Sequence, residues 1–215
     1  METDSGSIVP NSCSTANNLT VLQHYVSQLP VGDTLEVGLA FGASATLLSL
    51  YHHKRGVGTV HHAIDPFQTS QWGNAAMKHL GRCGLQGHFQ LHAEPSALAM
   101  ADLVRANKKF VLVYIDGSHL FEHVMSDFML ADQLLIDGGI LAFDDSSCDH
   151  VAKVVAFVRA NFSDAYKEES PYDITAPAQS WWKTRLAKLL GRQQLTIFRR
   201  LRASTRAWGT PLTNF

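Results

Sequence analysis

Short apolar runs alternate with amphipathic stretches along most of the chain. Leu19, Leu22 and Val26 recur at a helical period and predict a first helix over residues 15–29. Six consecutive apolar residues, Phe110–Ile115, predict a strand that is buried on both faces. We expect further strands over residues 33–38, 59–64, 88–92, 140–143 and 194–198, and further helices over residues 43–53, 74–80, 96–107, 120–135, 150–161 and 180–190.

This alternation is typical of βαβ units. Strands separated by helices of about 10–15 residues predict an α/β fold with a mostly parallel sheet. Right-handed crossovers would place helices on both faces of that sheet. Residues 1–14 are polar and predict a flexible tail, and residues 15–215 predict a single domain in which 164–215 has the weakest pattern.

The composition suits a globular protein. The chain has 215 residues, 46% of them apolar. No uninterrupted apolar run approaches the roughly 18 residues of a membrane span, and the amino-terminal sequence has no signal-peptide pattern. Cys13, Cys83 and Cys148 are odd in number and widely spaced, which favours reduced thiols. We therefore expect a cytoplasmic protein that does not interact with membranes.

The net charge of −1 hides two opposed segments. Residues 1–175 contain 10 basic and 19 acidic residues, whereas residues 176–215 contain 8 basic and no acidic ones. The basic segment has three interpretations: a solvated helix face, a site for an anionic substrate, or a contact with an acidic partner or nucleic acid. The acidic surplus of the longer segment would repel a phosphate backbone, so we do not expect nucleic acid as a partner.

Unusual residues follow the first two predicted strands, at the sheet edge where α/β proteins bind ligands. Gly38 and Gly42 are spaced G-x-x-x-G between a strand and a helix, a pattern that suits a ligand at the helix N-terminus. The alternative is a plain strand–helix turn. Asp65 ends the second strand, where an acid can accept hydrogen bonds from ribose hydroxyls, although Asp before Pro is also common in turns.

Three more carboxylates follow the fourth and fifth predicted strands, namely Asp116 and the pair Asp144 and Asp145. Adjacent strands would bring them together, and like charges that close repel unless protons or a cation intervene. A divalent cation such as Mg²⁺ fits three oxygen ligands, whereas the alternative is that one Asp of the pair caps the next helix. His119 lies on the same rim and is either a general base or a solvent-facing residue at a helix start.

Together these residues resemble the class I S-adenosylmethionine-dependent methyltransferases. The loop Glu36-x-Gly38-x-x-x-Gly42-x-Ser44 is similar to the first motif of that superfamily. Three further stretches resemble the metal-dependent small-molecule O-methyltransferases, particularly the macrocin-type sugar enzymes, and they cover residues 64–67, 115–119 and 134–145. The resemblance spans about residues 20–160 and implies a Rossmann-like methyltransferase fold with seven strands.

The resemblance also implies roles for individual residues. Asp116 and His119 would be catalytic, with His119 as the base. The metal ligands would be Asp116, Asp144 and Asp145. The residues that would bind S-adenosylmethionine are Glu36, Gly38, Gly42, Ser44, Asp65, Glu94 and Asp116.

The expected reaction is transfer of a methyl group from S-adenosylmethionine to a hydroxyl of a small molecule, such as a sugar, a phenol or a natural product. The basic segment leaves open an anionic acceptor, and a homodimer is a further option. Three alternatives remain. They are a nicotinamide-dependent oxidoreductase on a similar sheet, a non-catalytic nucleotide-binding module, and an RNA or DNA methyltransferase.

Overall fold

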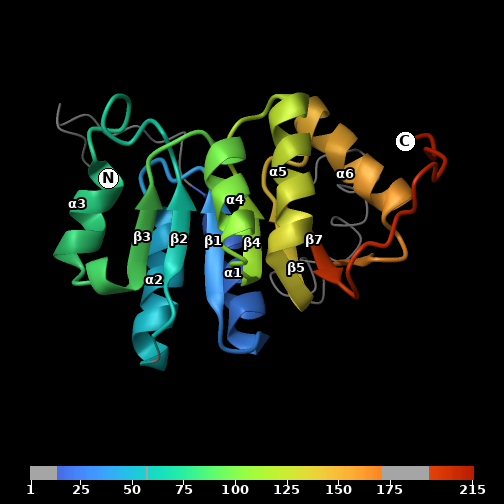
Figure 1. Ribbon diagram of the computed structural model, residues 1–215. Coiled ribbons are helices and arrows are strands. Elements are labelled where there is room, and N and C mark those ends of the chain that lie inside the picture. The colour runs from blue at the N-terminus through green and yellow to red at the C-terminus, as the bar shows by residue number, and fades with distance from the viewer. Residues whose placement is uncertain (1–13, 57, 171–193) are drawn as a thin grey trace, which may run out of the picture.

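A seven-stranded sheet forms the centre of the protein (Figure 1). The structure is a computed structural model that describes residues 14–56, 58–170 and 194–215. The strands are β1 (Asp33–Val37), β2 (His61–Ile64), β3 (Phe89–His92), β4 (Phe110–Ile115), β5 (Leu135–Phe143), β6 (Tyr166–Glu169) and β7 (Thr196–Arg200). The helices are α1 (Ala16–Gln28), α2 (Ala43–Arg55), α3 (Ala75–Arg82), the short η2 (Gln86–His88), α4 (Ser96–Arg105), α5 (Phe121–Leu134) and α6 (Asp149–Asn161).

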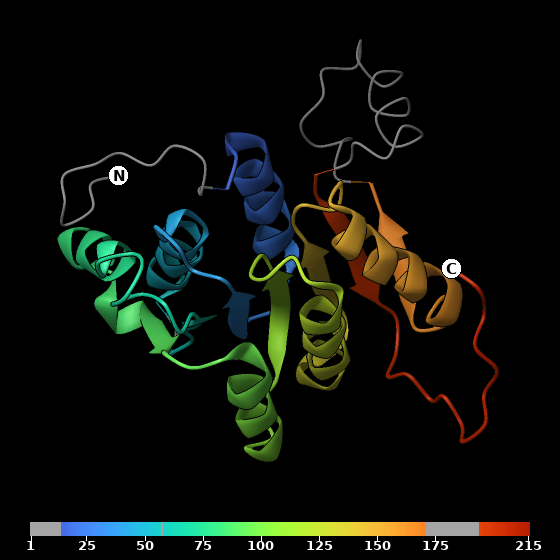
Figure 2. The same ribbon diagram turned by 90° about the horizontal axis from the view of Figure 1, so that it is seen from above.

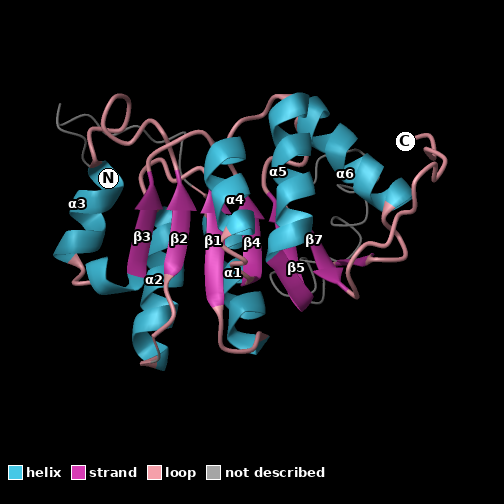
Figure 3. Ribbon diagram, in the orientation of Figure 1, coloured by secondary structure: helices cyan, strands magenta, loops and turns pink. Residues whose placement is uncertain are grey.

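The strand order is β3-β2-β1-β4-β5-β7-β6. The first five strands are parallel, whereas β7 runs antiparallel to both β5 and β6. The carboxyl ends of β1, β2 and β3 therefore meet at one edge, the upper edge in Figure 3. The expected α/β fold with a mostly parallel, seven-stranded sheet is confirmed.

Helices cover both faces of the sheet (Figure 2). On one face, α4, α5 and α6 share a core with alternate residues of β1 and β4, such as Leu35 and Val113. On the other face, α1 and α2 pack against Leu112 and Tyr114 of β4. Every residue of β4 is buried, because both of its faces are covered.

The structure differs from the sequence-based expectations at β5 and β6. We expected a helix through residue 135 and a turn at Gly138-Gly139, but α5 ends at Leu134 and β5 begins at once. Phe110 pairs with Leu135 and Leu112 with Ile140, so the glycines lie in a bulge within β5, where Gly138 has a φ of +81°. β6 was not expected at all. The helix predicted over 180–190 lies outside the described residues.

The antiparallel edge of the sheet uses the arginines of the basic segment. Arg199 pairs with Glu169 across the β6–β7 ladder at 2.6 Å, and Arg202 pairs with Asp164 at 3.1 Å. Arg200 is 6% exposed and donates to the carbonyl oxygen of Leu135. Arg206 donates to the carbonyl oxygen of Asn161 and lies over the ring of Phe162. Each of these four arginines thus has a partner within the chain, and the remaining basic residues of the segment lie outside the described residues.

None of the helices in the described part of the chain is long and apolar enough to cross a membrane.

Candidate functional site

Two adjoining cavities open at the carboxyl edge of the parallel strands. The first has a volume of about 550 Å³ and lies between the start of α1, the β1–α2 loop and the ends of β4 and β5. The second has about 610 Å³ and lies over β1, β2 and the start of α4. Their linings share Gly38, Ala40, Trp72, Asp116 and Gly117. The first cavity is lined by many polar side chains, whereas the second is mainly apolar, so the pair suits a long ligand with one polar end.

The glycine loop forms the wall between these cavities. Gly38 has a φ of +90°, and a Cβ atom there would lie 2.1 Å from the carbonyl oxygen of Asp116. Gly42 has a φ of +78° and ends the loop as the N-cap of α2, where a Cβ atom would lie 2.8 Å from Ala76. Both glycines are therefore needed for packing inside the protein, in addition to the ligand approach predicted from the sequence. Ser44 follows in the first turn of α2 and lines the first cavity.

Asp65 supports the glycine loop from β2. Its carboxylate accepts hydrogen bonds from the backbone N–H groups of Leu39, Ala40 and Phe67, at 3.3, 3.0 and 2.7 Å. The side chain of Gln68 donates a fourth at 2.8 Å. Asp65 lines the second cavity, as a ribose contact would require, but it already has four donors, so its observed role is to shape the loop.

Two further predicted cofactor residues lie away from the linings of these cavities. Glu94 is half-buried and lies near His92, where its charge partly offsets the lowering of the His92 pKa by burial. Glu36 is 0% exposed, and neither of its carboxylate oxygens has a hydrogen-bond partner among the described residues. An unsatisfied buried carboxylate beneath a ligand-binding loop is unusual and suits a cationic ligand group.

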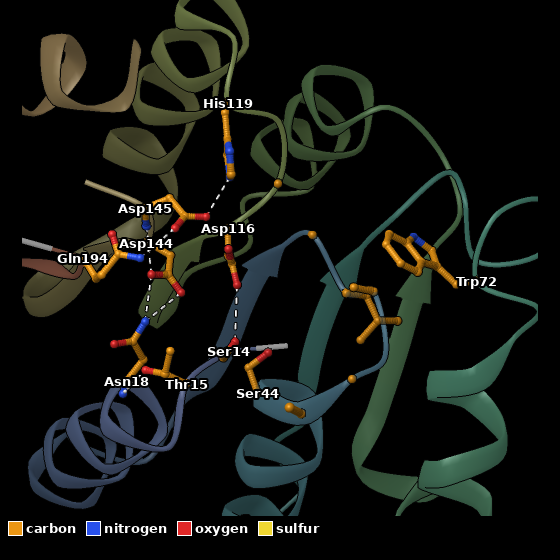
Figure 4. Close-up of a pocket in the computed structure, with 16 residues that line it drawn as sticks. Ser14, Thr15, Asn18, Ser44, Trp72, Asp116, His119, Asp144, Asp145 and Gln194 are labelled. Carbon is orange, nitrogen blue, oxygen red and sulfur yellow. Dashed lines mark hydrogen bonds and ion pairs between the residues drawn. The ribbon is translucent and has the colours of Figure 1, made fainter. Parts of the chain in front are cut away.

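Asp116 and Asp144 both line the first cavity (Figure 4). Both also contact the hydroxyl of Tyr114. The Tyr114 hydroxyl is 3.0 Å from Oδ2 of Asp116 and hydrogen-bonds to Asp144. Asn18 on α1 donates its side-chain amide to both oxygens of Asp144, at 2.8 and 3.0 Å. Ser14 donates to Asp116 at 3.3 Å. It is the last residue of the predicted flexible tail, whose other residues, 1–13, lie outside the described part of the chain.

The electrostatics of this pair follow from crowding and burial. Burial, together with the neighbouring Asp144, raises the pKa of Asp116 well above its usual range. Burial also raises the pKa of Asp144, and the hydrogen bonds from Tyr114, the Asp145 amide and Asn18 partly oppose this shift. The two carboxylates therefore hold a proton readily, which makes the pair a good site for a cation in place of that proton.

Asp145 and His119 complete the rim of the first cavity. His119 Nε2 lies 3.0 Å from Oδ2 of Asp145, and both side chains are partly exposed. Gln194 donates to the other Asp145 oxygen at 3.3 Å. Asp145 has a φ of +46°, a conformation that Asp tolerates better than most residues and that turns its side chain toward the rim. The predicted placement of His119 on the same rim agrees with this geometry.

Among the described residues, three side chains of the kinds that bind metal ions converge here. They are Asp116, His119 and Asp145, and their potential ligand atoms lie within 4.8 Å of one another. Two carboxylates and an imidazole fit a divalent cation. The predicted third ligand, Asp144, is not part of this group and is hydrogen-bonded by Tyr114 and Asn18. The structure thus brings Asp116 and Asp145 together as expected and adds His119, whereas the role of Asp144 as a ligand stays a prediction.

Sequence reasoning missed Tyr114 and Asn18 as site residues. Tyr114 was counted as one of six apolar strand residues, but it lies two positions before Asp116 and therefore on the same side of β4. A tyrosine two residues before a strand-end carboxylate was a usable signal. Asn18 gave no comparable signal, because its contact with Asp144 depends on how α1 packs against the sheet.

Comparison with known proteins agrees with this site. Residues 35–146, just over half of the chain, match the profile of a family described as a methyltransferase domain. The chain belongs to this methyltransferase family. It is a class I, S-adenosylmethionine-dependent methyltransferase, as its motifs led us to expect. None of the curated proteins matches this methyltransferase significantly.

Solved structures show the same fold at low sequence identity. A provisionally assigned O-methyltransferase from Klebsiella pneumoniae is 14% identical, with a TM-score of 0.68, 89% of this chain covered and 83% of that one. A provisionally assigned rRNA methylase from Clostridium thermocellum is 13% identical, with a TM-score of 0.62 and coverages of 87% and 100%. CalS11, a TDP-rhamnose 3′-O-methyltransferase of calicheamicin biosynthesis, is 16% identical, with a TM-score of 0.59 and coverages of 90% and 78%.

Proposed function

We propose that this methyltransferase transfers a methyl group to a hydroxyl of a small molecule, with the help of a bound divalent cation such as Mg²⁺. The observation that carries the proposal is the convergence of Asp116, His119 and Asp145 at the mouth of the polar cavity. Many methyltransferase chemistries need only a cofactor cavity, whereas paired carboxylates beside an imidazole suit the binding and deprotonation of a hydroxyl.

The cofactor would occupy both cavities. The apolar second cavity, with Phe67 and Pro95 in its lining, suits the adenosine part. The methionine part would lie along Gly38 and the first turn of α2, whose N-terminus favours a carboxylate. The buried carboxylate of Glu36 lies at the end of β1, just before the loop, and would suit the amino group. The acceptor would then bind beside the methionine part, at the end of the polar cavity that Asp116, His119 and Asp145 line.

In the reaction, an oxygen–carbon bond forms as the sulfonium–carbon bond breaks, and the hydroxyl proton must leave. A bound cation would lower the pKa of the acceptor hydroxyl. His119, whose Nε2 lies 3.0 Å from Oδ2 of Asp145, would accept the hydroxyl proton, and the cation would then be held by Asp116 and Asp145. Alignment of the two reactants in the enclosed cavity supplies a further part of the acceleration.

The acceptor is proposed to be a small molecule and not RNA. The exposed part of the site carries acidic side chains, and the described arginines at the sheet edge are paired within the chain. Phosphate backbones are bound by free basic groups, which the described site does not offer. A cavity of about 550 Å³ has the usual size of a small-molecule site.

The test has two stages. Calorimetry with S-adenosylhomocysteine, NADH and Mg²⁺ in turn should show binding of the first and third, and binding of NADH alone would contradict the proposal. Methyl transfer from labelled S-adenosylmethionine should then be screened against hydroxylated sugars, phenols and acids, with a structured rRNA fragment in parallel. We expect a small hydroxyl acceptor and loss of turnover in EDTA. Full activity in excess EDTA would exclude the cation, and methylation of the RNA alone would exclude the small-molecule acceptor.

A further inference from the structure

The β1–α2 loop contains a strained residue that is not a glycine. Ala40 has a φ of +44°, which lies in the left-handed region that residues with a Cβ atom rarely adopt. Gly38 and Gly42 also have positive φ values, but glycine adopts them without this cost. For an alanine, the cost favours other backbone conformations by roughly 5- to 30-fold. Ala40 lines both cavities, so its conformation decides which backbone atoms face a bound ligand.

Two side chains from the segment after β2 hold Ala40 in this conformation. The backbone N–H group of Ala40 donates to Oδ2 of Asp65 at 3.0 Å, and its carbonyl oxygen accepts from Nε2 of Gln68 at 2.8 Å. Both polar backbone groups of this one residue are therefore bound by side chains of another segment. A strained residue persists only where its surroundings fix it in this way, and such residues cluster at ligand sites.

Gln68 is itself held in place. Its Nε2 also donates to Oδ2 of Asp65 at 2.8 Å, so one amide group joins the carbonyl oxygen of Ala40 to the carboxylate that binds the N–H group of the same residue. Both partners are acceptors, and this determines which end of the amide points toward them. The side chain is 2% exposed, and the backbone carbonyl oxygen of Gln68 accepts from the N–H group of Asn74 at 2.7 Å. Ala40, Asp65 and Gln68 thus form a closed ring of hydrogen bonds.

We propose that Gln68 is a positioning residue for the cofactor, because it keeps Ala40 left-handed and the glycine loop in the shape that binds S-adenosylmethionine. The proposal rests on the function proposed above. Without Gln68, the carbonyl oxygen of Ala40 is free to turn into the polar cavity, where it would repel the carboxylate that the N-terminus of α2 attracts. Only the molecules that keep the left-handed conformation then bind the cofactor, and the apparent affinity falls in proportion to their fraction.

A positioning role and a purely structural role for Gln68 lead to different results. If Gln68 only stabilised the fold, its loss would lower the Tm without changing the affinity of the folded protein for the cofactor. If Gln68 positions Ala40, its loss should be compensated by a residue that adopts the left-handed conformation unaided. Ala40→Gly supplies such a residue, so the two roles are separated by combining a change at position 68 with Ala40→Gly.

Calorimetry with S-adenosylhomocysteine measures the coupling between the two positions. Gln68→Met keeps the length of the side chain and removes its donor, and we expect the affinity to fall about tenfold. In the Gln68→Met background, Ala40→Gly should recover at least about threefold, because glycine needs no partner to adopt a positive φ. In the wild-type background, Ala40→Gly should change the affinity less, since Gln68 already fixes the conformation there. Gln71→Met, which alters an exposed glutamine of the same segment, is the matched control and should bind as the wild type does.

A thermal scan checks that each variant is folded. Gln68→Asn, whose side chain is shorter by one carbon atom, replaces Gln68→Met if that variant does not fold. Wild-type affinity in a folded variant of Gln68, or a loss of affinity that Ala40→Gly does not reduce, would overturn the inference while leaving the proposed function intact. Failure of the wild type to bind S-adenosylhomocysteine would instead overturn the proposed function.

Discussion

Charge is handled in opposite ways at the two ends of this molecule. At the antiparallel edge, Arg199, Arg202 and Arg206 each meet a carboxylate or a carbonyl oxygen of the same chain. At the carboxyl edge of the parallel strands, Asp116 and Asp144 lie side by side, and their hydrogen-bond partners among the described residues are neutral groups.

The difference separates charges that pair within the chain from charges that we propose bind a cation. Paired arginines add modestly to stability, or substantially when buried. Buried carboxylates without a cation lower the stability of the folded protein, and such a cost is typical of functional sites. The net charge of −1 conceals this contrast, because it sums the arginines of the antiparallel edge and the carboxylates of the parallel edge.

The largest effect should come from the rim of the acidic site. Asp145→Asn keeps the side-chain shape and tolerates the backbone at φ +46°, but it removes one negative charge from the proposed cation site. We expect the kcat of the metal-dependent reaction to fall about 100- to 1000-fold. Asp149→Asn, an exposed acid at the start of α6, is the matched control and should keep full activity. Similar rates in the two variants would contradict a functional role for Asp145.

At the opposite edge, Arg200→Ala should affect folding and not chemistry. The change leaves the Leu135 carbonyl oxygen without its donor and removes the ion pair with Asp137 at 3.4 Å. We expect a loss of about 2–3 kcal/mol in the free energy of unfolding, measured by urea denaturation. The kcat of the folded fraction should not change. If Arg200→Ala had normal stability but a lower kcat, Arg200 would have a role in the reaction instead of in folding.

Asp116→Asn should stabilise the metal-free protein while abolishing activity. Burial and Asp144 raise the pKa of Asp116, so its ionised form opposes folding at neutral pH. This cost is absent below the ordinary Asp pKa of about 4 and grows as the pH rises toward the raised pKa. Thermal melting across pH 4–8 without metal should therefore show a stabilisation of about 1 kcal/mol or more at pH 7–8 that disappears at the acid end. If Asp116→Asn instead lowered the stability at neutral pH, the contrast between the paired arginines and the buried carboxylates would be wrong.

The smallest effect is expected for Arg202→Ala. Its ion pair with Asp164 is largely exposed, and such pairs contribute less than about 1 kcal/mol. Urea denaturation should place it between the wild type and Arg200→Ala, close to the wild type. A loss as large as that of Arg200→Ala would show that exposure does not separate the two arginines.

The parallel half of the fold was predictable because its signals are local. Phe110–Ile115 is apolar throughout, as a strand covered on both faces must be, and the β1–α2 glycines mark a turn wherever they occur. By contrast, the β6 sequence Tyr166–Glu169 carries two adjacent glutamates and no apolar run. Its strand depends on cross-strand pairing between Glu169 and Arg199, which lie far apart in the sequence.

The residues of the site also fall into a predictable group and an unpredictable one. Strand-end residues such as Asp116, Asp145 and His119 were placed correctly at one edge, because parallel strands must bring their carboxyl ends together. The partners that set the environment of these residues were not predictable. Asn18 reaches Asp144 because α1 packs against one face of the sheet. Asp65 accepts hydrogen bonds from backbone donors of the glycine loop, which no sequence pattern displays.

The contact between Gly38 and the Asp116 carbonyl has a consequence for how the site can be altered. A single side-chain carbon at position 38 would collide with the backbone at the end of β4. The glycine loop and the backbone that carries Asp116 are therefore packed against each other, and neither can move alone. Laboratory evolution of acceptor range will therefore find few solutions that move either loop alone. Variation is better directed to the start of α1, where Ser14, Thr15 and Asn18 line the same cavity from a separate element.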